Sequence, residues 1–73
     1  MRTIRVELDF DAAAAVWWVS ASDVPGVRIE APSLDRMISR LPAVIFDILQ
    51  ETDGGSEPFE LVTQVRTIAD AAA

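Results

Sequence analysis

The segment Ile29-Glu30-Ala31-Pro32-Ser33-Leu34-Asp35-Arg36-Met37-Ile38 marks a change of periodicity in this chain. Before Pro32, apolar and polar residues alternate, as they do in a strand that buries one face. After Ser33, apolar residues recur at steps of three and four, which is typical of an amphipathic helix. Ser33 is a suitable helix N-cap, and Asp35 in the first turn complements the positive end of the helix dipole. The sequence therefore predicts a short strand followed directly by a helix.

The predicted helix carries one continuous apolar stripe, formed by Leu34, Met37, Ile38, Leu41, Val44, Ile45, Ile48 and Leu49. Pro42 lies within this stripe, where a proline removes a backbone donor and clashes with the carbonyl four residues back. We therefore expect a kink or a break near Arg40–Leu41. Because the stripe keeps its phase across Pro42, one kinked helix is favoured over two separate helices. The polar residues 52–58 then form a loop.

Two strands are predicted upstream of this segment. Residues 3–10 alternate, with Ile4, Val6, Leu8 and Phe10 on one side. Residues 15–22 are apolar on both faces until Ser20, which is typical of a central or covered strand. Residues 11–14 connect the two strands. Asp23-Val24-Pro25-Gly26 is the strongest turn signal, and it leads into the third strand, residues 27–31.

A fourth strand is predicted from Phe59 to about Thr67, because apolar residues alternate again there. The fold class is therefore α+β with the order β-β-β-α-β: an antiparallel three-stranded meander, one crossover helix on one face, and a fourth strand. A helical crossover makes the third and fourth strands parallel within one sheet. Residues 1–73 form a single domain, and we expect the tail, residues 68–73, to fray.

The composition excludes most catalytic chemistry. The chain has 73 residues, six basic against twelve acidic, with a formal charge of −6 and no Cys or His. All six cations are Arg, so the serines have neither His nor Lys to activate them as nucleophiles. Asp9, Asp11 and Glu30 could together bind a hard cation, as in a degenerate metal-dependent nuclease. Carboxylates at strand ends are more often solvated, so we predict no enzyme, no metal site and no cofactor.

The acidic balance also restricts the partners. Duplex nucleic acid requires a cationic surface, whereas an acidic chain suits a basic protein. The longest apolar run, residues 12–19, is far shorter than the roughly 20 residues that cross a bilayer. The N-terminal residues have a basic start but lack the hydrophobic segment that follows it in a signal peptide. We therefore expect a cytoplasmic protein that binds neither nucleic acid nor membrane.

The adjacent tryptophans Trp17 and Trp18 bear on the second face of the sheet. Neighbouring residues of a strand point to opposite faces, so one ring lies under the helix and the other on the uncovered face. An exposed Trp is typical of the centre of an interface, either with a partner or between two copies in a homodimer. Cover by a loop or by the C-terminal strand is the alternative.

The run Val16–Gly26, followed by Glu30–Asp35, resembles the N-terminal domain of HicB-type antitoxins. That family has a strand with an aromatic residue followed by Val and Ser, then a Pro-Asp-Leu-Pro-Gly-like turn. A short strand and a Thr-Leu-type helix start follow. The resemblance spans about residues 4–50.

The resemblance implies a partial RNase H-like fold that occludes a small basic mRNA interferase of the HicA type. In that family a separate C-terminal segment binds operator DNA, and the residues after Val65 do not carry its pattern. We predict partner contacts at Trp17, Trp18, Asp23, Arg28 and Glu30. The alternative is a self-associating structural or adaptor domain, a homodimer through the uncovered sheet face.

Overall fold

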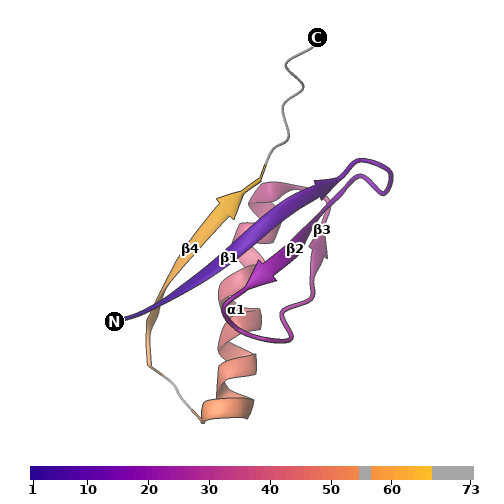
Figure 1. Ribbon diagram of the computed structural model, residues 1–73. Helices are drawn as coiled ribbons and strands as arrows, with labels where there is room; N and C mark the ends of the chain where they lie inside the picture. Colours follow the sequence, from indigo (N-terminus) through magenta and orange to yellow (C-terminus); the bar gives the residue numbers. More distant parts are fainter. Residues whose placement is uncertain (55–56, 67–73) are drawn as a thin grey trace.

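The computed structural model describes residues 1–54 and 57–66 as one sheet with one helix behind it (Figure 1). The elements are β1 (Arg2–Asp11), β2 (Val16–Ser22), β3 (Glu30–Ala31), α1 (Leu34–Asp53) and β4 (Phe59–Val65). The four strands lie in the order β3-β2-β1-β4. This arrangement confirms the predicted α+β class and the β-β-β-α-β order. The predicted fraying of residues 68–73 concerns a segment outside the described residues.

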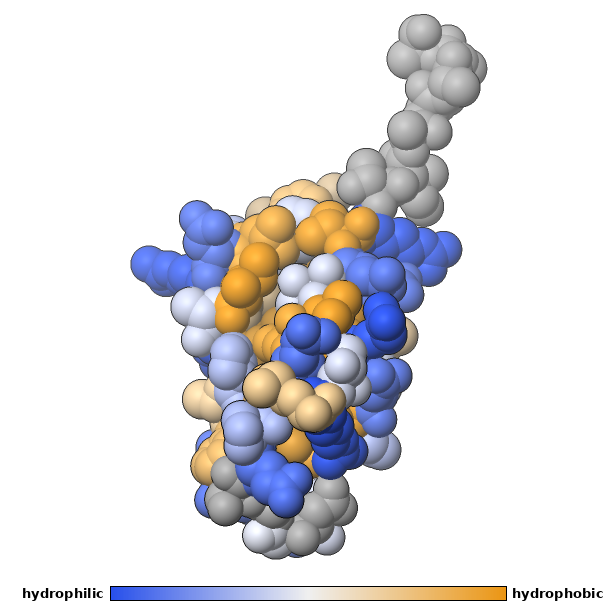
Figure 2. Space-filling view, turned by 90° about the vertical axis from the view of Figure 1, so that its left-hand side faces the viewer, coloured by the Kyte–Doolittle hydropathy of each residue, from blue (hydrophilic) through white to orange (hydrophobic). Residues whose placement is uncertain are grey.

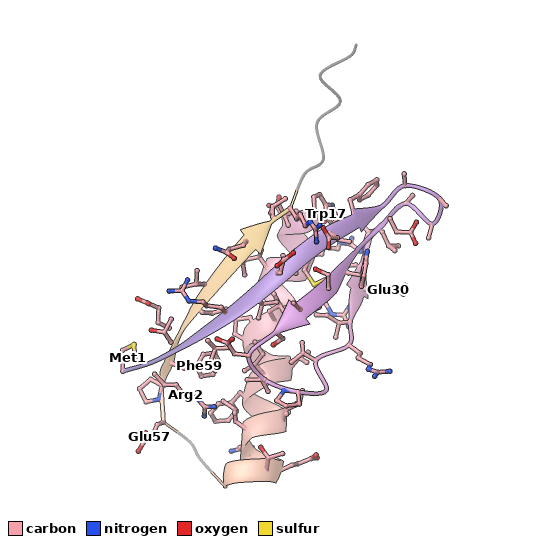
Figure 3. The ribbon with its side chains drawn as sticks, in the orientation of Figure 1. Met1, Arg2, Trp17, Glu30, Glu57 and Phe59 are labelled. Carbon is pink, nitrogen blue, oxygen red and sulfur yellow. The ribbon has the colours of Figure 1, made fainter. Side chains whose placement is uncertain are left out.

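Strand β1 lies at the centre of the sheet, antiparallel to β2 and parallel to β4. Its alternation buries Ile4, Val6 and Leu8, which are at most 1% exposed, because every second side chain faces α1. Arg2 pairs with Phe59 at one end of the β1–β4 ladder, and Figure 3 shows these two residues at the same end of the sheet. The helix therefore crosses from β3 at one edge to β4 at the other, and the two edge strands are parallel, as predicted.

The hairpin between β1 and β2 depends on Asp11. Its Oδ1 accepts hydrogen bonds from the amides of Ala13 at 3.0 Å and Ala14 at 3.2 Å. The chain then passes through Ala15, which has a φ of 56°. Alanines have little turn preference of their own, so the Asp11 carboxylate is the local signal that directs this connection.

The predicted third strand is shorter than expected. The alternation over residues 27–31 does hold, since Val27 and Ala31 are buried and Arg28 and Glu30 are exposed. Only Glu30 and Ala31 pair with β2, however, opposite Trp18 and Trp17. The chain reverses direction at Gly26, which has a φ of 86°, but the residues between Gly26 and Glu30 do not pair with β2. The prediction of a strand from residue 27 was therefore too long.

Helix α1 begins directly after Ser33, as predicted, but it continues through Thr52 and Asp53, which were predicted to lie in the following loop. The Ser33 Oγ accepts a hydrogen bond from the Arg36 amide at 3.2 Å. At the other end, Gly54 adopts a φ of 65° and its amide donates to the Gln50 carbonyl. The helix runs through Pro42 as a single element, so it does not break there. Its buried stripe consists of Met37, Leu41, Ile45 and Leu49.

The two faces of the sheet differ in cover. Helix α1 packs on the face that carries Ile4, Val6 and Leu8, here called the helix face. In the described part of the chain, no element covers the opposite face, here called the open face. The open face carries mostly polar side chains, from Arg5, Glu7, Asp9, Trp18, Glu30, Val62 and Gln64. Such a face meets either water or a partner.

Candidate protein-binding site

The two tryptophans lie on opposite faces, as predicted. Trp17 is on the helix face, half-buried against the core, with its ring centroid 5.3 Å from that of Phe10 and the two rings tilted by 56°. Trp18 is on the open face and is 41% exposed. Phe10 and Trp17 are cross-strand partners, so their contact stabilises the hairpin end of β1 and β2. Trp18 is the tryptophan available to a partner.

Two carboxylates flank Trp18 on the open face. Asp9 of β1 lies directly opposite Trp18 on one side, and Glu30 of β3 lies directly opposite it on the other. Directly opposed residues in antiparallel strands project from the same face, so the three side chains form one row across the sheet. We call Asp9, Trp18 and Glu30 the acidic row. It combines an aromatic ring with negative charge on both sides.

A pocket of about 650 Å³ opens beside this row, at the edge of the sheet, and its walls are Trp18, Val19, Arg28, Ile29, Glu30 and Arg40. It exists because β3 pairs with β2 at only two residues, which leaves a gap along the rest of the β2 edge. Arg40 of α1 closes one wall by donating from Nη1 to the Glu30 carbonyl at 3.1 Å. The pocket therefore joins the helix, the β2 edge and the acidic row.

The structure brings three of the five predicted contact residues together. Trp18, Arg28 and Glu30 line the same pocket, whereas Trp17 lies on the helix face. Figure 3 shows Trp17 near the hairpin and Glu30 on β3. Asp23 is elsewhere and accepts a hydrogen bond at Oδ2 from the Arg5 amide at 2.9 Å. Asp23 thus holds a turn rather than joining the pocket.

Asp9 and Arg40 belong to this site although the sequence did not indicate them as partner contacts. Asp9 occupies an ordinary polar position in the alternation of β1. Its place beside Trp18 depends on the pairing register, which the local pattern does not specify. Arg40 likewise is one of several polar residues on α1, and only the docking of the helix on the sheet places it against Glu30.

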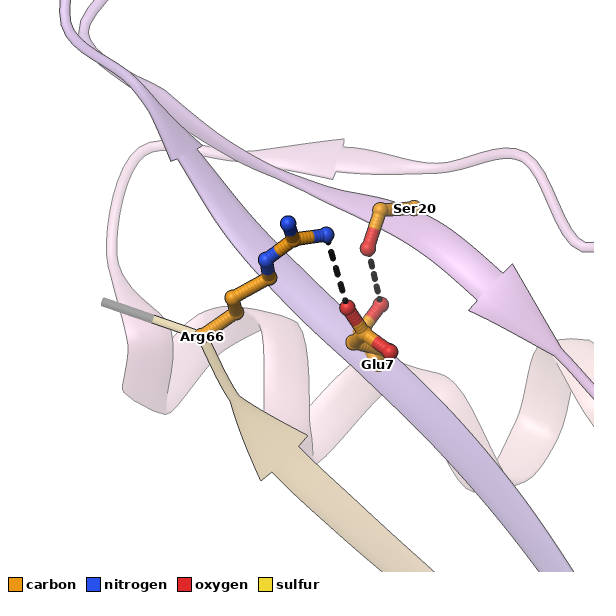
Figure 4. A network of polar contacts seen from close by, with 3 residues as sticks. All are labelled: Glu7, Ser20 and Arg66. Atoms are coloured by element: carbon orange, nitrogen blue, oxygen red, sulfur yellow. Dashed lines mark hydrogen bonds and ion pairs between the residues drawn. The ribbon is translucent and has the colours of Figure 1, made fainter. Parts of the chain in front are cut away.

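A second polar cluster lies further along the open face (Figure 4). Arg66 contacts Glu7, with Nη1 3.5 Å from Oε1, and Ser20 donates to the Glu7 carbonyl at 3.2 Å. The ladder between β1 and β2 shifts register between Glu7 and Leu8, which leaves Ser20 as the extra residue of a bulge. Ser20 satisfies a carbonyl at the point where the ladder is interrupted.

A family model described as a domain of unknown function, DUF1902, matches residues 3–72. The chain belongs to the DUF1902 family. A solved structure of a hypothetical protein, TTHA1013 from the extremely thermophilic bacterium Thermus thermophilus, is 28% identical and superposes with a TM-score of 0.80. The alignment covers 94% of this chain and 99% of that one. A search of curated proteins finds no match.

Asp9, Asp11 and Glu30 are the carboxylates that the sequence suggests for a hard cation. Residues 1–54 and 57–66 contain no group of three or more His, Cys, Asp or Glu side chains placed to hold a metal ion. The Asp11 carboxylate, one of the three considered for a cation, is bonded to the amides of its own turn. Helix α1 lacks the apolar length that would be needed to cross a membrane.

Proposed function

We propose that this DUF1902 domain is a protein-binding module of the antitoxin type, which occludes a small basic mRNA interferase of the HicA type in the cytoplasm. The resemblance of residues 4–50 to HicB-type antitoxins suggests the partner class. The acidic row is the structural observation that supports the proposal. No catalytic step by this chain is part of it.

The acidic row suits a cationic side chain of the partner. An arginine or lysine above the ring of Trp18 gains a cation–π contact, and the carboxylates of Asp9 and Glu30 stand on both sides of that position. Trp is also enriched among the residues that contribute most of the binding energy of protein interfaces. The formal charge of −6 adds attraction toward a basic partner at longer range.

The pocket beside the acidic row adds positively charged side chains to the negatively charged ones of the row. Arg28 and Arg40 line it beside Glu30, so a partner group entering the pocket meets donors as well as an acceptor. Mixed charges of this kind favour a partner with a defined pattern of basic and acidic groups over a uniformly basic one. This contributes specificity for a protein surface over a polyanion.

The test is co-expression with the protein encoded beside this chain, followed by native mass spectrometry and titration calorimetry. Trp18→Ala is expected to weaken the complex about 30-fold, the effect of losing a central interface Trp. Ile38→Ala is the matched control, since Ile38 on α1 has the same exposed fraction of 41%. A neighbour that is not small and basic, or that does not co-purify, would refute the antitoxin role.

A homodimer through the open face is the alternative, and the exposed ring of Trp18 is the observation that favours it. The charges of Arg5, Glu7 and Asp9 on that face count against it, because the core of a homodimer interface is depleted in charged residues. Sedimentation of the Trp18→Ala variant decides between the two, since an unchanged oligomeric state removes the open face as the dimer interface.

A further inference from the structure

Strand β4 has one unpaired edge in the described structure. One side of β4 pairs with β1 from Phe59 to Val65, and no described strand pairs with the other side (Figure 1). Edge strands are usually protected by Lys, Pro or a bulge, because their free amides and carbonyls attract another strand. The sequence of β4, Phe-Glu-Leu-Val-Thr-Gln-Val, has neither Lys nor Pro, and its ladder with β1 has no register shift. Nothing in β4 itself prevents a further strand from pairing there.

The hydrogen bond from the Arg66 amide to the Leu8 carbonyl at 3.0 Å identifies which backbone groups point outward. Successive residues of a strand direct their amides and carbonyls to alternate sides. Since the Arg66 amide points to β1, the amides and carbonyls of the even-numbered residues of β4 also form hydrogen bonds with β1. The amides and carbonyls of Leu61, Thr63 and Val65 therefore point away from β1, into the free edge.

The sequence of β4 is complementary to itself in one antiparallel register. In this register Thr63 lies opposite Thr63 of the partner subunit. The residues whose amides and carbonyls point away from β1 then face the same set of residues in the partner, as backbone hydrogen bonding requires. Leu61 then faces Val65 of the partner subunit on the helix face. Glu60 faces Arg66 of the partner subunit on the open face, and the two-fold axis repeats this pair of opposite charges. Arg66 contacts Glu7 of its own subunit through Nη1 at 3.5 Å, but its side chain is 63% exposed, so the rest of the guanidinium can reach across.

Apolar side chains on the helix face beside β4 are incompletely covered. Val65 is 45% exposed, and Leu61 is only half-buried against the core. Figure 2, which looks onto the β4 side of the molecule, shows apolar side chains gathered there between polar ones. A two-fold axis normal to the sheet places both helices on the same side, so a second copy would cover this surface as well as the edge.

We propose that two copies of this chain pair antiparallel through β4, in the register centred on Thr63, to form one continuous sheet. Charge complementarity between Glu60 and Arg66 of the partner subunit selects the register. The acidic row runs across β1, β2 and β3 on the open face, and pairing edge to edge through β4 leaves that face uncovered in both copies. The dimer is thus independent of the proposed partner and compatible with it.

The test uses two charge reversals, Glu60→Arg and Arg66→Glu, in analytical ultracentrifugation. Each single variant places like charges opposite each other at two symmetric positions, so each should raise the dimer dissociation constant about tenfold. Mixing the two variants restores both opposite-charge pairs, so the mixture should form heterodimers with nearly the wild-type dissociation constant. The double variant Glu60→Arg/Arg66→Glu should also recover.

Matched controls distinguish the loss of the pairing between Glu60 and Arg66 from a general effect of the changed net charge. Glu51→Arg and Arg36→Glu make the same changes of charge at exposed positions of α1 and should leave the dimer unchanged. Circular dichroism in the near ultraviolet, through the Trp17 environment, verifies that each variant is folded. A monomeric wild type, single variants that dimerise normally, or a mixture without heterodimers would each overturn the proposal.

Discussion

Arg5 and Asp23 exchange two hydrogen bonds across the sheet. The Arg5 amide donates to Asp23 Oδ2 at 2.9 Å, and the Asp23 amide donates to the Arg5 carbonyl at 3.0 Å. The last cross-strand pair of β1 and β2 is Val6 with Ser22, so Asp23 extends this ladder by using its side chain as an acceptor. The turn that follows is thereby held against β1.

Replacing Asp23 by alanine should lower the free energy of unfolding by about 1 kcal/mol, because the Arg5 amide loses its protein acceptor. Asp23→Asn keeps an oxygen at the same place and should cost less than half as much. Urea denaturation of both variants measures the difference. Equal losses for Ala and Asn would show that charge, and not the hydrogen bond, is responsible.

Substitution of Ala15 by glycine should stabilise the protein by about 0.5 kcal/mol, the balance of two opposing effects. Ala15 has a φ of 56°, a conformation that costs an L-residue about 1–2 kcal/mol and glycine almost nothing. Part of the gain is lost to the greater freedom of glycine in the unfolded chain. Ala14→Gly, at a neighbour without a positive φ, is the control and should destabilise. Thermal unfolding measures the stability change of each variant. A loss of stability in Ala15→Gly would contradict the explanation.

The core and surface positions of α1 should respond differently to the same deletion. Ile45→Val removes one methylene from a fully buried side chain and should cost about 1 kcal/mol. Ile38→Val makes the same change at a side chain that is 41% exposed and should stay within about 0.5 kcal/mol. Chemical denaturation compares them directly. If the two variants lose the same stability, the packing of α1 on the sheet is not as described.

Much of the fold could be predicted because its signals are local. The alternation of β1 and the stripe of α1 each arise from side chains a few residues apart, and Ser33 marks the start of the helix by its own side chain. The length of β3 was overestimated, because alternation persists over residues 27–31 although pairing with β2 does not. Alternating burial therefore predicts that a segment is extended, but it does not predict that the segment is hydrogen-bonded to a neighbouring strand.

By itself, the sequence determined the element order, the start of the helix and the fact that Trp17 and Trp18 point to opposite faces. Only the tertiary structure decided that Trp18 is the exposed one, and that Asp9 and Glu30 flank it. It also decided that β4 pairs with β1 and that no described strand pairs with the other side of β4. The physical reason is range: periodicity comes from neighbours along the chain, whereas register and strand order depend on which distant segments bury each other's apolar faces.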